Sequence, residues 1–553
     1  MTAQPPSNAE RVNYLLPDAP RWPVDASKPV ISLRGVVKRF GDLTLMDGLD
    51  LDIHTGMTTV LCGRSGCGKS VLLRLMNGLM LPDEGVVTLF GEDTAKVHPQ
   101  RLIALRKRLT MMFQSYALMD SFTVTENIAF PLYENTSMKW GEIVPMVQDL
   151  LELLDLSDAG GKMPSDLSGG MKKRVSLARA VVSNPEVVLF DEPTTGLDPV
   201  MIEFVDQMII RTREHFGITS VIVSHDMTST LRLADRIAML DEGRVVAYGD
   251  VDDVLARELD LVKVFFAGAE TVRGLSSGAT ERPPSGAPAT ASSREPDEVV
   301  VEVTDLCKSF GPHDVLKGVS LQIPKNKITV IIGGSGSGKS VIMKHIIGLL
   351  QPNSGSVSVF GQDMAKLDSR QMLEMRSRFG MLFQGAALLD SMSVRENVAF
   401  PLVERGTSKV EVRRETNAIL EKLNLLEIAD SFPSQISNGQ RKRVGLARAI
   451  ITKPEIMIYD EPTTGQDPVM IRYVDDMIVE AQELFDITAL VVSHDMASAF
   501  RVAHQIAFLH EGEIRACGSP ADVSANPDPW VRRFIFAGTP EGEKACRELG
   551  LEH

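Results

Sequence analysis

Two short glycine-rich segments carry the residue types needed to hold phosphate groups. They read Gly-Arg-Ser-Gly-Cys-Gly-Lys-Ser at 63–70 and Gly-Gly-Ser-Gly-Ser-Gly-Lys-Ser at 333–340. Both match the Walker A pattern GxxxxGK[ST], in which backbone N–H groups wrap a phosphate chain and the next helix adds partial positive charge. Each follows an apolar run typical of a buried strand, which argues against a chance match.

The lysine and the last serine of each loop have separate predicted roles. Lys69 and Lys339 would reach the β- and γ-phosphates of ATP, and Ser70 and Ser340 would hold Mg²⁺. The sequence therefore predicts two sites for ATP with Mg²⁺. The predicted nucleotide-binding residues of the loops are Gly63, Arg64, Ser65, Gly66, Cys67, Gly68, Lys69, Ser70, Gly333, Gly334, Ser335, Gly336, Ser337, Gly338, Lys339 and Ser340.

A second pair of motifs supplies carboxylates. Asp191-Glu192 and Asp460-Glu461 each end a buried apolar run. An aspartate in this position completes the Mg²⁺ shell, which is the Walker B role, and the next glutamate can polarise an attacking water as general base. An acidic pair can also simply start a turn, but its recurrence at the same spacing from a Walker A loop favours catalysis.

A histidine and a glutamine recur in both halves. His225 and His494 end further apolar runs, and we interpret them as γ-phosphate sensors that orient the attacking water. Gln114 and Gln384 would touch both Mg²⁺ and a loop that moves, and each would also bind nucleotide. The predicted catalytic residues are Glu192, His225, Glu461 and His494. The predicted metal-binding residues are Ser70, Gln114, Asp191, Ser340, Gln384 and Asp460.

Alternating strands and helices must position these residues. Buried strands are predicted before the motifs at 58–62, 187–190, 221–224, 328–332, 456–459 and 490–493. Shorter strands open the two halves at 30–33 and 299–303, and helical stretches include 143–154 and 410–423. This order predicts an α/β fold with a largely parallel central sheet in each half, whose ligand lies at the carboxyl ends of the strands.

The two sets of motifs form an internal repeat. The Walker A lysines are 270 residues apart and the histidines 269, so the second copy has lost one residue. This spacing indicates a duplicated domain rather than a solenoid. The chain between the copies is rich in Pro, Gly and Ser, which predicts a flexible linker. The predicted segments are a polar flexible tail at 1–29, domains at 30–268 and 299–540, the linker at 269–298, and a C-terminal tail at 541–553.

Composition narrows the class of protein. The 553 residues are 44% hydrophobic and 24% charged, which excludes wholesale disorder. The net charge of −15 argues against a general nucleic-acid binder. No apolar run is long enough to span a bilayer, so a membrane role requires a partner. The five scattered cysteines and a start without signal-peptide character favour a reducing cytosol.

A further motif brings in a known family. The segments Leu-Ser-Gly-Gly-Met-Lys-Lys-Arg at 167–174 and Ile-Ser-Asn-Gly-Gln-Arg-Lys-Arg at 436–443 resemble the LSGGQ signature of ABC ATPases. Gly-Leu-Asp at 196–198 and Gly-Gln-Asp at 465–467 resemble that family's D-loops. The resemblance covers nearly the whole chain from 30 to 538. It implies two tandem P-loop NTPase (ABC ATPase) domains, each with a helical lobe beside its sheet.

In that family each ATP lies between one Walker A loop and the opposite signature. Here this implies that Lys69 shares its ATP with Ser437, and Lys339 with Ser168, within one chain. Phe40 and Phe310 align with the family's adenine-stacking aromatic, although either could equally belong to a core. The resemblance assigns nucleotide binding to Ser168, Gly169, Gly170, Ser437, Asn438, Gly439 and Gln440.

Both signatures depart from the family pattern. Met171 replaces a glutamine, which is a mild change, and Asn438 replaces the first glycine. We expect that glycine to adopt an unusual φ, which asparagine tolerates better than most residues. Both sites are therefore expected to hydrolyse ATP, the one containing Asn438 more slowly.

The region after each Q-loop glutamine indicates a branch of the family. Phe-Gln-Ser-Tyr-Ala-Leu-Met-Asp at 113–120 and Phe-Gln-Gly-Ala-Ala-Leu-Leu-Asp at 383–390, with the Ala-Phe-Pro-Leu of 129–132 and 399–402, resemble the ATPases of Mla and Mce lipid transporters. Those relatives are usually single-domain chains that pair, so a fused pair leaves stoichiometry and substrate open. General importers of other solutes share parts of this pattern.

This resemblance implies a partner and a location. A separate multispan permease would dock in the Q-loop grooves at the cytoplasmic face of the membrane, with extracytoplasmic lipid-binding subunits in the same system. Because both ATPase domains lie within one chain, one chain could serve each transporter. The sequence offers apolar residues that could line that groove. The same residues could instead pack within the domain's own helical lobe. They are Met111, Met112, Leu118, Met119, Leu382, Leu388 and Leu389.

Other classes of tandem ATPase stay open. Proteins of this kind that act on the ribosome usually carry a longer, charged helical linker, and those that act on DNA usually insert coiled coils or zinc modules. Tandem sugar-importer ATPases often have a degenerate second Walker A loop, whereas both loops are intact here.

Overall fold

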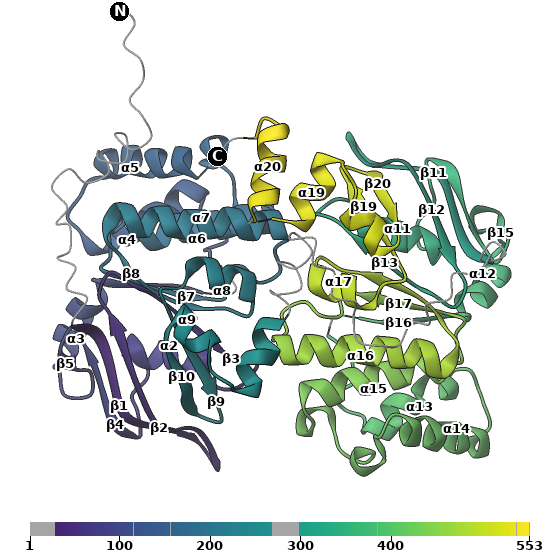
Figure 1. Cartoon of the computed structure of the whole chain (residues 1–553), viewed down its shortest axis with the longest axis horizontal. Coiled ribbons are helices and arrows are strands. Elements are labelled where there is room, and N and C mark those ends of the chain that lie inside the picture. Colours follow the sequence, from purple (N-terminus) through teal and green to yellow (C-terminus); the bar gives the residue numbers. More distant parts are fainter. Residues whose placement is uncertain are drawn as a thin grey trace, which may run out of the picture. The chain divides into compact units, whose positions relative to one another are not determined.

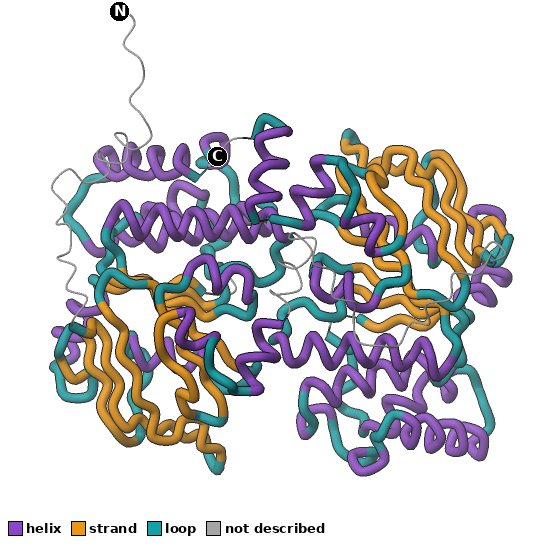
Figure 2. Tube along the Cα trace, in the orientation of Figure 1, coloured by secondary structure: helices purple, strands orange, loops and turns teal. Residues whose placement is uncertain are grey.

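The computed structural model describes residues 28–113, 116–154, 156–267, 298–383, 385–537 and 539–551. The chain divides into two units, the first of residues 1–197 and 201–266 and the second of residues 198–200 and 267–553. Each consists of strands with helices packed beside them (Figures 1 and 2). The predicted N-terminal tail, apart from its last two residues, and the predicted linker, apart from Glu298, lie outside the described residues. So do Gln114 and Gln384.

The first unit contains one four-stranded and one six-stranded sheet. Its strands are β1 (Pro29–Phe40), β2 (Leu43–His54), β3 (Thr58–Gly63), β4 (Glu84–Leu89), β5 (Glu92–Asp93), β6 (Leu109–Met112), β7 (Val187–Asp191), β8 (Thr219–Val223), β9 (Arg236–Asp241) and β10 (Arg244–Asp250). Its helices are α2 (Lys69–Met76), α3 (Pro99–Arg106), α4 (Val124–Asn135), α5 (Trp140–Leu153), α6 (Gly169–Val181), α7 (Pro199–Phe216), α8 (Met227–Leu233) and α9 (Val251–Leu255), with a further one at 260–267.

The second unit repeats this organisation. Its strands are β11 (Val299–Phe310), β12 (His313–Pro324), β13 (Ile328–Ile332), β14 (Ser354–Val359), β15 (Gln362–Asp363), β16 (Phe379–Leu382), β17 (Ile456–Asp460), β18 (Thr488–Val492), β19 (Gln505–His510) and β20 (Glu513–Gly518). Its helices are α11 (Lys339–Ile346), α12 (Ser369–Arg376), α13 (Val394–Glu404), α14 (Lys409–Lys422), α15 (Asn438–Ile450), α16 (Pro468–Phe485), α17 (Met496–Val502), α18 (Pro520–Ser524), α19 (Pro529–Ile535) and α20 (Pro540–Glu548).

The central sheet is largely parallel in both units, as predicted. Its strand orders are β6-β7-β8-β3-β9-β10 and β16-β17-β18-β13-β19-β20, and only the last strand of each sheet is antiparallel to its neighbour. Every residue of β7 and of β8 is buried, because other layers cover both faces of the sheet. The carboxyl ends of β3, β7 and β8 therefore meet along one edge, as do those of their counterparts.

Alternating residues of the central strands face two separate cores. In β13, Ile331 packs with the antiparallel sheet and α11, whereas Val330 packs with the helices that follow Val394. This alternation follows from the two-residue period of side chains along a strand. The antiparallel sheet and the helical layer thus hold the central sheet, and the motifs at its edge, from opposite sides.

The end of the chain differs from the predicted C-terminal tail. Residues 540–548 form α20, in which Ala545 and Cys546 are buried. Arg532 of α19 donates hydrogen bonds to Glu541, which ties the two helices together. None of the described helices has the length and apolar character that crossing a membrane requires.

Candidate functional site

Each Walker A loop joins the end of a central strand to a helix. In the first loop Gly63 has a φ of 151°, and a Cβ there would lie 2.3 Å from the carbonyl oxygen of Leu240. Gly333 has the same constraint, at 2.2 Å from the oxygen of Leu509. Only glycine fits such a close approach of two backbones, so the first glycine of each motif is required by the fold itself.

The Walker A lysines are already oriented along their loops. Lys69 Nζ donates to the carbonyl oxygens of Gly63 at 2.8 Å and Arg64 at 2.9 Å. Lys339 makes the same two bonds at the same distances, to Gly333 and Gly334. Both lysines are buried, and burial lowers the pKa of Lys339. Each amine is thus held by two loop carbonyls at the start of a helix, where a phosphate could replace one acceptor.

Two of the residues predicted to hold Mg²⁺, Ser70 and Asp191, are in contact in the first unit. Ser70 Oγ donates to Asp191 Oδ1 at 3.0 Å. Burial raises the pKa of Asp191, and the hydrogen bond from Ser70 opposes that shift. In the second unit burial likewise raises the pKa of Asp460. A hydroxyl beside a partly desolvated carboxylate is the type of oxygen donor set that Mg²⁺ prefers, so the residues fit this ion.

The predicted general base of the first unit is held by two side chains. Glu192 Oε1 lies 2.9 Å from His225 Nε2, and Thr195 Oγ1 donates to Glu192 Oε2 at 3.0 Å. Burial raises the pKa of Glu192, but the hydrogen bond and charge of His225 outweigh it, so the net shift is downward. The carboxylate is therefore ionised at neutral pH, as a general base must be.

The second unit repeats this arrangement. His494 Nδ1 lies 2.8 Å from Glu461 Oε2, which also accepts from Thr464 Oγ1 at 2.8 Å. Burial raises the pKa of Glu461, and the bond to His494 reverses the net shift. Burial lowers the pKa of His494, and its bond to Glu461 reverses that shift too. The two predicted catalytic residues of each unit are thus in direct contact.

Each signature segment caps a helix. Ser168 Oγ accepts from the N–H of Met171 at the start of α6, and Ser437 Oγ accepts from Gln440 at the start of α15. The glycine replaced by Asn438 was expected to need an unusual φ, and this is wrong: neither Gly169 nor Asn438 has a positive φ. Both begin helices, where any L-residue is accommodated.

The two candidate stacking aromatics lie at the surface. Phe40 is 45% exposed and Phe310 is 47% exposed, at the ends of β1 and β11. The ammonium of Lys38 lies 5.7 Å from the ring centroid of Phe40, and that of Lys308 lies 5.5 Å from Phe310. Neither ring belongs to a core, so the alternative that the sequence left open is excluded. The exposed rings of Phe40 and Phe310 suit stacking on an adenine base.

Two of the apolar residues considered for partner docking face the interior instead. Met112 and Leu382 are each only 2% exposed, because they are the last residues of β6 and β16 and point into the core. The next residues, Phe113 and Phe383, are 38% and 45% exposed. At these two positions the exposed apolar side chain is therefore the one that follows the predicted residue, whereas Leu389 is exposed as expected.

Sequence reasoning missed a set of polar contacts on the signature helices. Arg179 of α6 donates to the carbonyl oxygens of Tyr116 and Ala117, just after the Q-loop glutamine. Arg448 of α15 binds Ala386 and Ala387 in the same way. These four carbonyls belong to residues with positive φ, so the arginines stabilise an otherwise unfavourable turn.

Buried charges also recur between helices of each unit. Asp206 of α7 accepts from Ser229 Oγ at 2.7 Å and from Arg232 at 2.5 Å, both on α8. Burial raises the pKa of Asp206 to about 7. Asp475 repeats these contacts with Ser498 and Arg501, and its pKa is also raised by burial to about 7. The same residue types, Asp, Ser and Arg, occur at equivalent positions of the two copies, and this is the sequence signal that could have found them.

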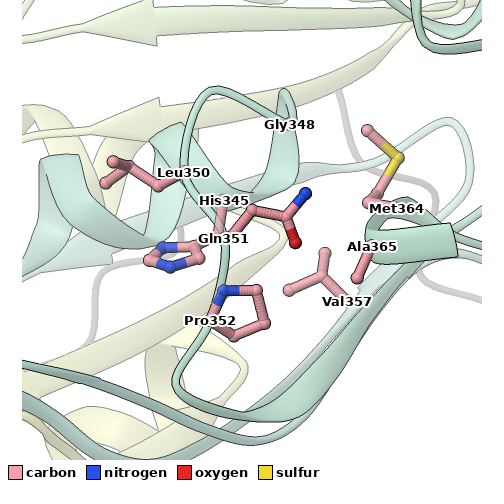
Figure 3. Close-up of a pocket in the computed structure, with 8 residues that line it drawn as sticks. All are labelled: His345, Gly348, Leu350, Gln351, Pro352, Val357, Met364 and Ala365. Atoms are coloured by element: carbon pink, nitrogen blue, oxygen red, sulfur yellow. The ribbon is translucent and has the colours of Figure 1, made fainter. Parts of the chain in front are cut away.

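A small pocket in the second unit lies away from these motifs. It is lined by His345 near the end of α11, by Gln351 in the segment after that helix, and by Met364 and Ala365 (Figure 3). The nucleotide motif is at the opposite, N-terminal end of that helix. His345 is 1% exposed, and the residue at the equivalent position of the first copy is Leu75. The pocket is therefore separate from the phosphate loop.

Comparison with known proteins places these motifs in a family. The family model described as "ABC transporter" matches residues 46–195 and 316–464, together more than half of the chain. A protein of Vibrio parahaemolyticus, named provisionally as an ABC transporter ATP-binding protein, is 28% identical over 88% of both chains. A nucleoside import ATP-binding protein of Lactococcus lactis is 27% identical, covering 90% of this chain and 96% of its own.

One comparison with a solved structure concerns a single copy of the repeat. The chain matches CbiO1 of Clostridium perfringens, described as part of the ABC transporter complex CbiONQ, at 25% identity. The match covers 46% of this chain and 100% of that one, with a TM-score of 0.40.

Proposed function

Because the chain belongs to the ABC transporter family and is an ATP-hydrolysing subunit, we propose that its two halves close on two MgATP molecules and so drive a separate permease. The observation that carries this proposal is the pair formed by Glu192 and His225, repeated by Glu461 and His494, beside intact Walker A loops. Ionised glutamates next to phosphate-binding lysines are the groups that water attack on a γ-phosphate requires.

The chain's own residues divide the chemistry between them. Lys69 and Lys339 bind the β- and γ-phosphates, exchanging one loop carbonyl for a phosphate oxygen. Glu192 and Glu461 then accept a hydrogen bond from the attacking water, and the histidines hold both water and γ-phosphate in place. The residues proposed to hold Mg²⁺ are Ser70, Gln114, Asp191, Ser340, Gln384 and Asp460. When bound, the ion neutralises charge that develops on the phosphate oxygens.

Each ATP would be shared between the two halves. We assign Lys69 and Ser437 to one nucleotide and Lys339 and Ser168 to the other, in the head-to-tail arrangement of the family. Phe40 and Phe310 would stack on the adenine rings, which their exposed position supports. Since the helix starts at Ser168 and Ser437 carry partial positive charge, they suit a phosphate of the opposite nucleotide.

The permease would dock near the segment after the Q-loop. In the first unit Leu79, Ile103 and Phe113 expose 57%, 54% and 38% of their surfaces. The segments that carry Leu79 and Ile103 are in contact, because Arg106 of α3 donates to the carbonyl of Asn77. In the second unit Arg376 of α12 makes the equivalent bond to Ile347. Exposed apolar side chains on neighbouring segments fit an amphipathic helix. This would place the protein at the cytoplasmic face of the membrane.

Lipid is the proposed cargo, with a permease of Mla or Mce type and its extracytoplasmic lipid-binding subunits. The support is the sequence after each Q-loop, at 113–132 and 383–402. A second candidate is an importer of another solute, which the full-length similarity to the nucleoside import protein of Lactococcus lactis favours.

Co-purification from the native membrane tests the partner and the cargo. Chain carrying an affinity tag, extracted in mild detergent, is expected to bring down a small multispan permease and phospholipid-binding subunits. Recovery with a permease and a nucleoside-binding subunit would favour the second candidate. Recovery with ribosomes and no permease would contradict transport.

Substitution of the glutamates tests the chemistry and the proposed inequality of the two sites. Glu192→Gln and Glu461→Gln each remove a general base, a change worth about 10²–10⁴-fold at one site. Glu461→Gln is expected to lower ATP turnover more, because the Lys69 site shares the signature in which the side chain of Asn438 replaces a glycine and hinders close approach of the backbone to the nucleotide. Phosphate release under saturating MgATP measures both variants. Equal losses would contradict the inequality.

A further inference from the structure

Each signature helix carries one lysine that is buried within its own unit. Lys173 of α6 is 2% exposed and Lys442 of α15 is 5% exposed. Burial lowers the pKa of each to about 8. Burying an amine without a compensating partner lowers the stability of the fold by several kcal/mol. A buried lysine at this position in both copies therefore calls for a physical role.

The buried amines bind the loops that carry the proposed general bases. Lys173 Nζ donates a hydrogen bond to the carbonyl oxygen of Thr195, three residues after Glu192. Lys442 Nζ donates to the carbonyl oxygen of Pro462, the residue directly after Glu461. The acceptors differ by two positions, but both lie in the short segment between the Walker B strand and the D-loop.

In the first unit the same threonine connects the lysine to the glutamate. Thr195 accepts from Lys173 through its carbonyl and donates through its hydroxyl to Glu192 Oε2, at 3.0 Å. The charge of Glu192 also raises the pKa of Lys173 against the effect of burial. The lysine thus acts on the carboxylate through one intervening residue and through the electrostatic field.

The glutamates need such support because their backbones are strained. Glu192 has a φ of 54° and Glu461 a φ of 49°, in the left-handed region that non-glycine residues seldom adopt. A conformation of this kind persists only where surrounding contacts over-determine it. One such contact is the backbone bond from each glutamate to Val223 or Val492, and the buried lysine supplies another.

We propose that Lys173 and Lys442 are positioning residues that connect each signature helix to the general-base loop of the same unit, and thereby set the rate of ATP hydrolysis. The inference rests on the proposed general-base role of Glu192 and Glu461. Each helix starts at the serine assigned to the opposite nucleotide. A shift of that helix on nucleotide binding would therefore reach the glutamate of its own unit through the lysine.

The test uses full-length chain and compares two double variants. Lys173→Met with Lys442→Met keeps side-chain length but removes the donor, and Lys173→Gln with Lys442→Gln keeps an N–H donor without the charge. We expect the methionine pair to lower kcat about 10- to 100-fold, as small misplacements of catalytic groups do. KM for ATP should change less than about twofold, because the lysines do not touch the nucleotide. The glutamine pair should recover part of the lost kcat.

Matched controls separate this role from folding and from the proposed function. Lys162→Met with Lys409→Met makes the same substitution at one exposed lysine in each unit and should leave kcat unchanged. A wild-type kcat in the methionine pair would overturn the proposal, as would parallel losses of thermal stability, ATP affinity and kcat. If Glu192→Gln with Glu461→Gln leaves turnover intact, the general-base role itself fails. If that pair is inactive while the methionine pair is not, only the present inference fails.

Discussion

Glu192 and Glu461 combine two features that rarely occur together in a structural residue. Each has a left-handed backbone and a carboxylate that contacts both a histidine and a threonine. In Glu192 the two contacts are made by different oxygens, and in Glu461 by the same oxygen. Strained backbone of this kind costs about 1–3 kcal/mol, and it concentrates at sites where geometry matters for chemistry. At the scale of single residues, therefore, the glutamates are the positions most consistent with catalysis.

Asp206 offers a test of electrostatics away from the nucleotide. Its folded-state pKa of about 7 is above the ordinary value of 3.8. The folded state therefore binds the proton more tightly than the unfolded state, so this group lowers stability as pH rises from about 4 to 7. The amide in Asp206→Asn cannot ionise, so the variant does not lose stability through this group as the pH rises. The melting temperature of the variant minus that of wild type should become more positive between pH 5.5 and 8.

Ser229→Ala provides the matched control for Asp206. It removes one hydrogen bond to the same carboxylate but leaves the titrating group in place, so it should keep the downward trend of stability with pH. If the difference in melting temperature instead stays constant from pH 5.5 to 8, then Arg232 holds the carboxylate ionised throughout this range and the direction of the pKa shift is wrong.

At the scale of elements, the two signature helices differ at their first turn. Ser437 and Gln440 form a complete capping box, since the N–H of Ser437 also donates to Gln440 Oε1 at 2.9 Å. The first helix has only the serine half, because Met171 has no acceptor in that position. The replacement that looked mild in sequence thus leaves one N–H at the start of α6 without this partner.

Met171→Gln should therefore stabilise α6. Completing a capping box is worth about 0.5 kcal/mol, which corresponds to a rise of about 1–2 °C in the melting temperature of a unit of this size. Differential scanning calorimetry measures it. Met171→Leu serves as control, because it retains apolar bulk without an acceptor. An equal rise in both variants would show that packing, not capping, is responsible.

At the scale of the whole chain, both sets of ATPase motifs are present in one polypeptide. If each ATP is shared between the two halves of a single chain, hydrolysis needs no second chain. Specific activity should then stay constant over about a hundredfold dilution, since no association step is involved. A pairing of separate chains would give specific activity that rises with concentration.

Mixing of variants supplies an independent check. Lys69→Ala and Lys339→Ala each disable one Walker A loop, and chains carrying one or the other are combined in equal amounts. The mixture is expected to show the average of the two separate activities, because the halves of different chains do not exchange. Activity above that average would indicate sites built between chains.

Local sequence was sufficient for the fold class and for the main contacts of the site. An apolar strand followed by a glycine loop or an acidic pair fixes which residues stand at a strand's end. In a parallel sheet those ends meet, which is why the sequence alone places Glu192 and His225 at the same edge of the sheet, where they are in contact. Duplication strengthened each inference, because both copies must satisfy the same geometry.

Only the tertiary structure decided which buried polar groups touch one another and which apolar residues face outward. The contact of Lys173 with Thr195 depends on how α6 packs against a loop 22 residues away, and periodicity reports burial without naming a partner. Met112 is buried and the next residue, Phe113, is partly exposed, because one step along an extended chain reverses the direction of the side chain. Residues 541–548 form a helix rather than a tail because α19 provides the surface that buries Ala545. These outcomes belong to packing between distant segments, which local sequence does not determine.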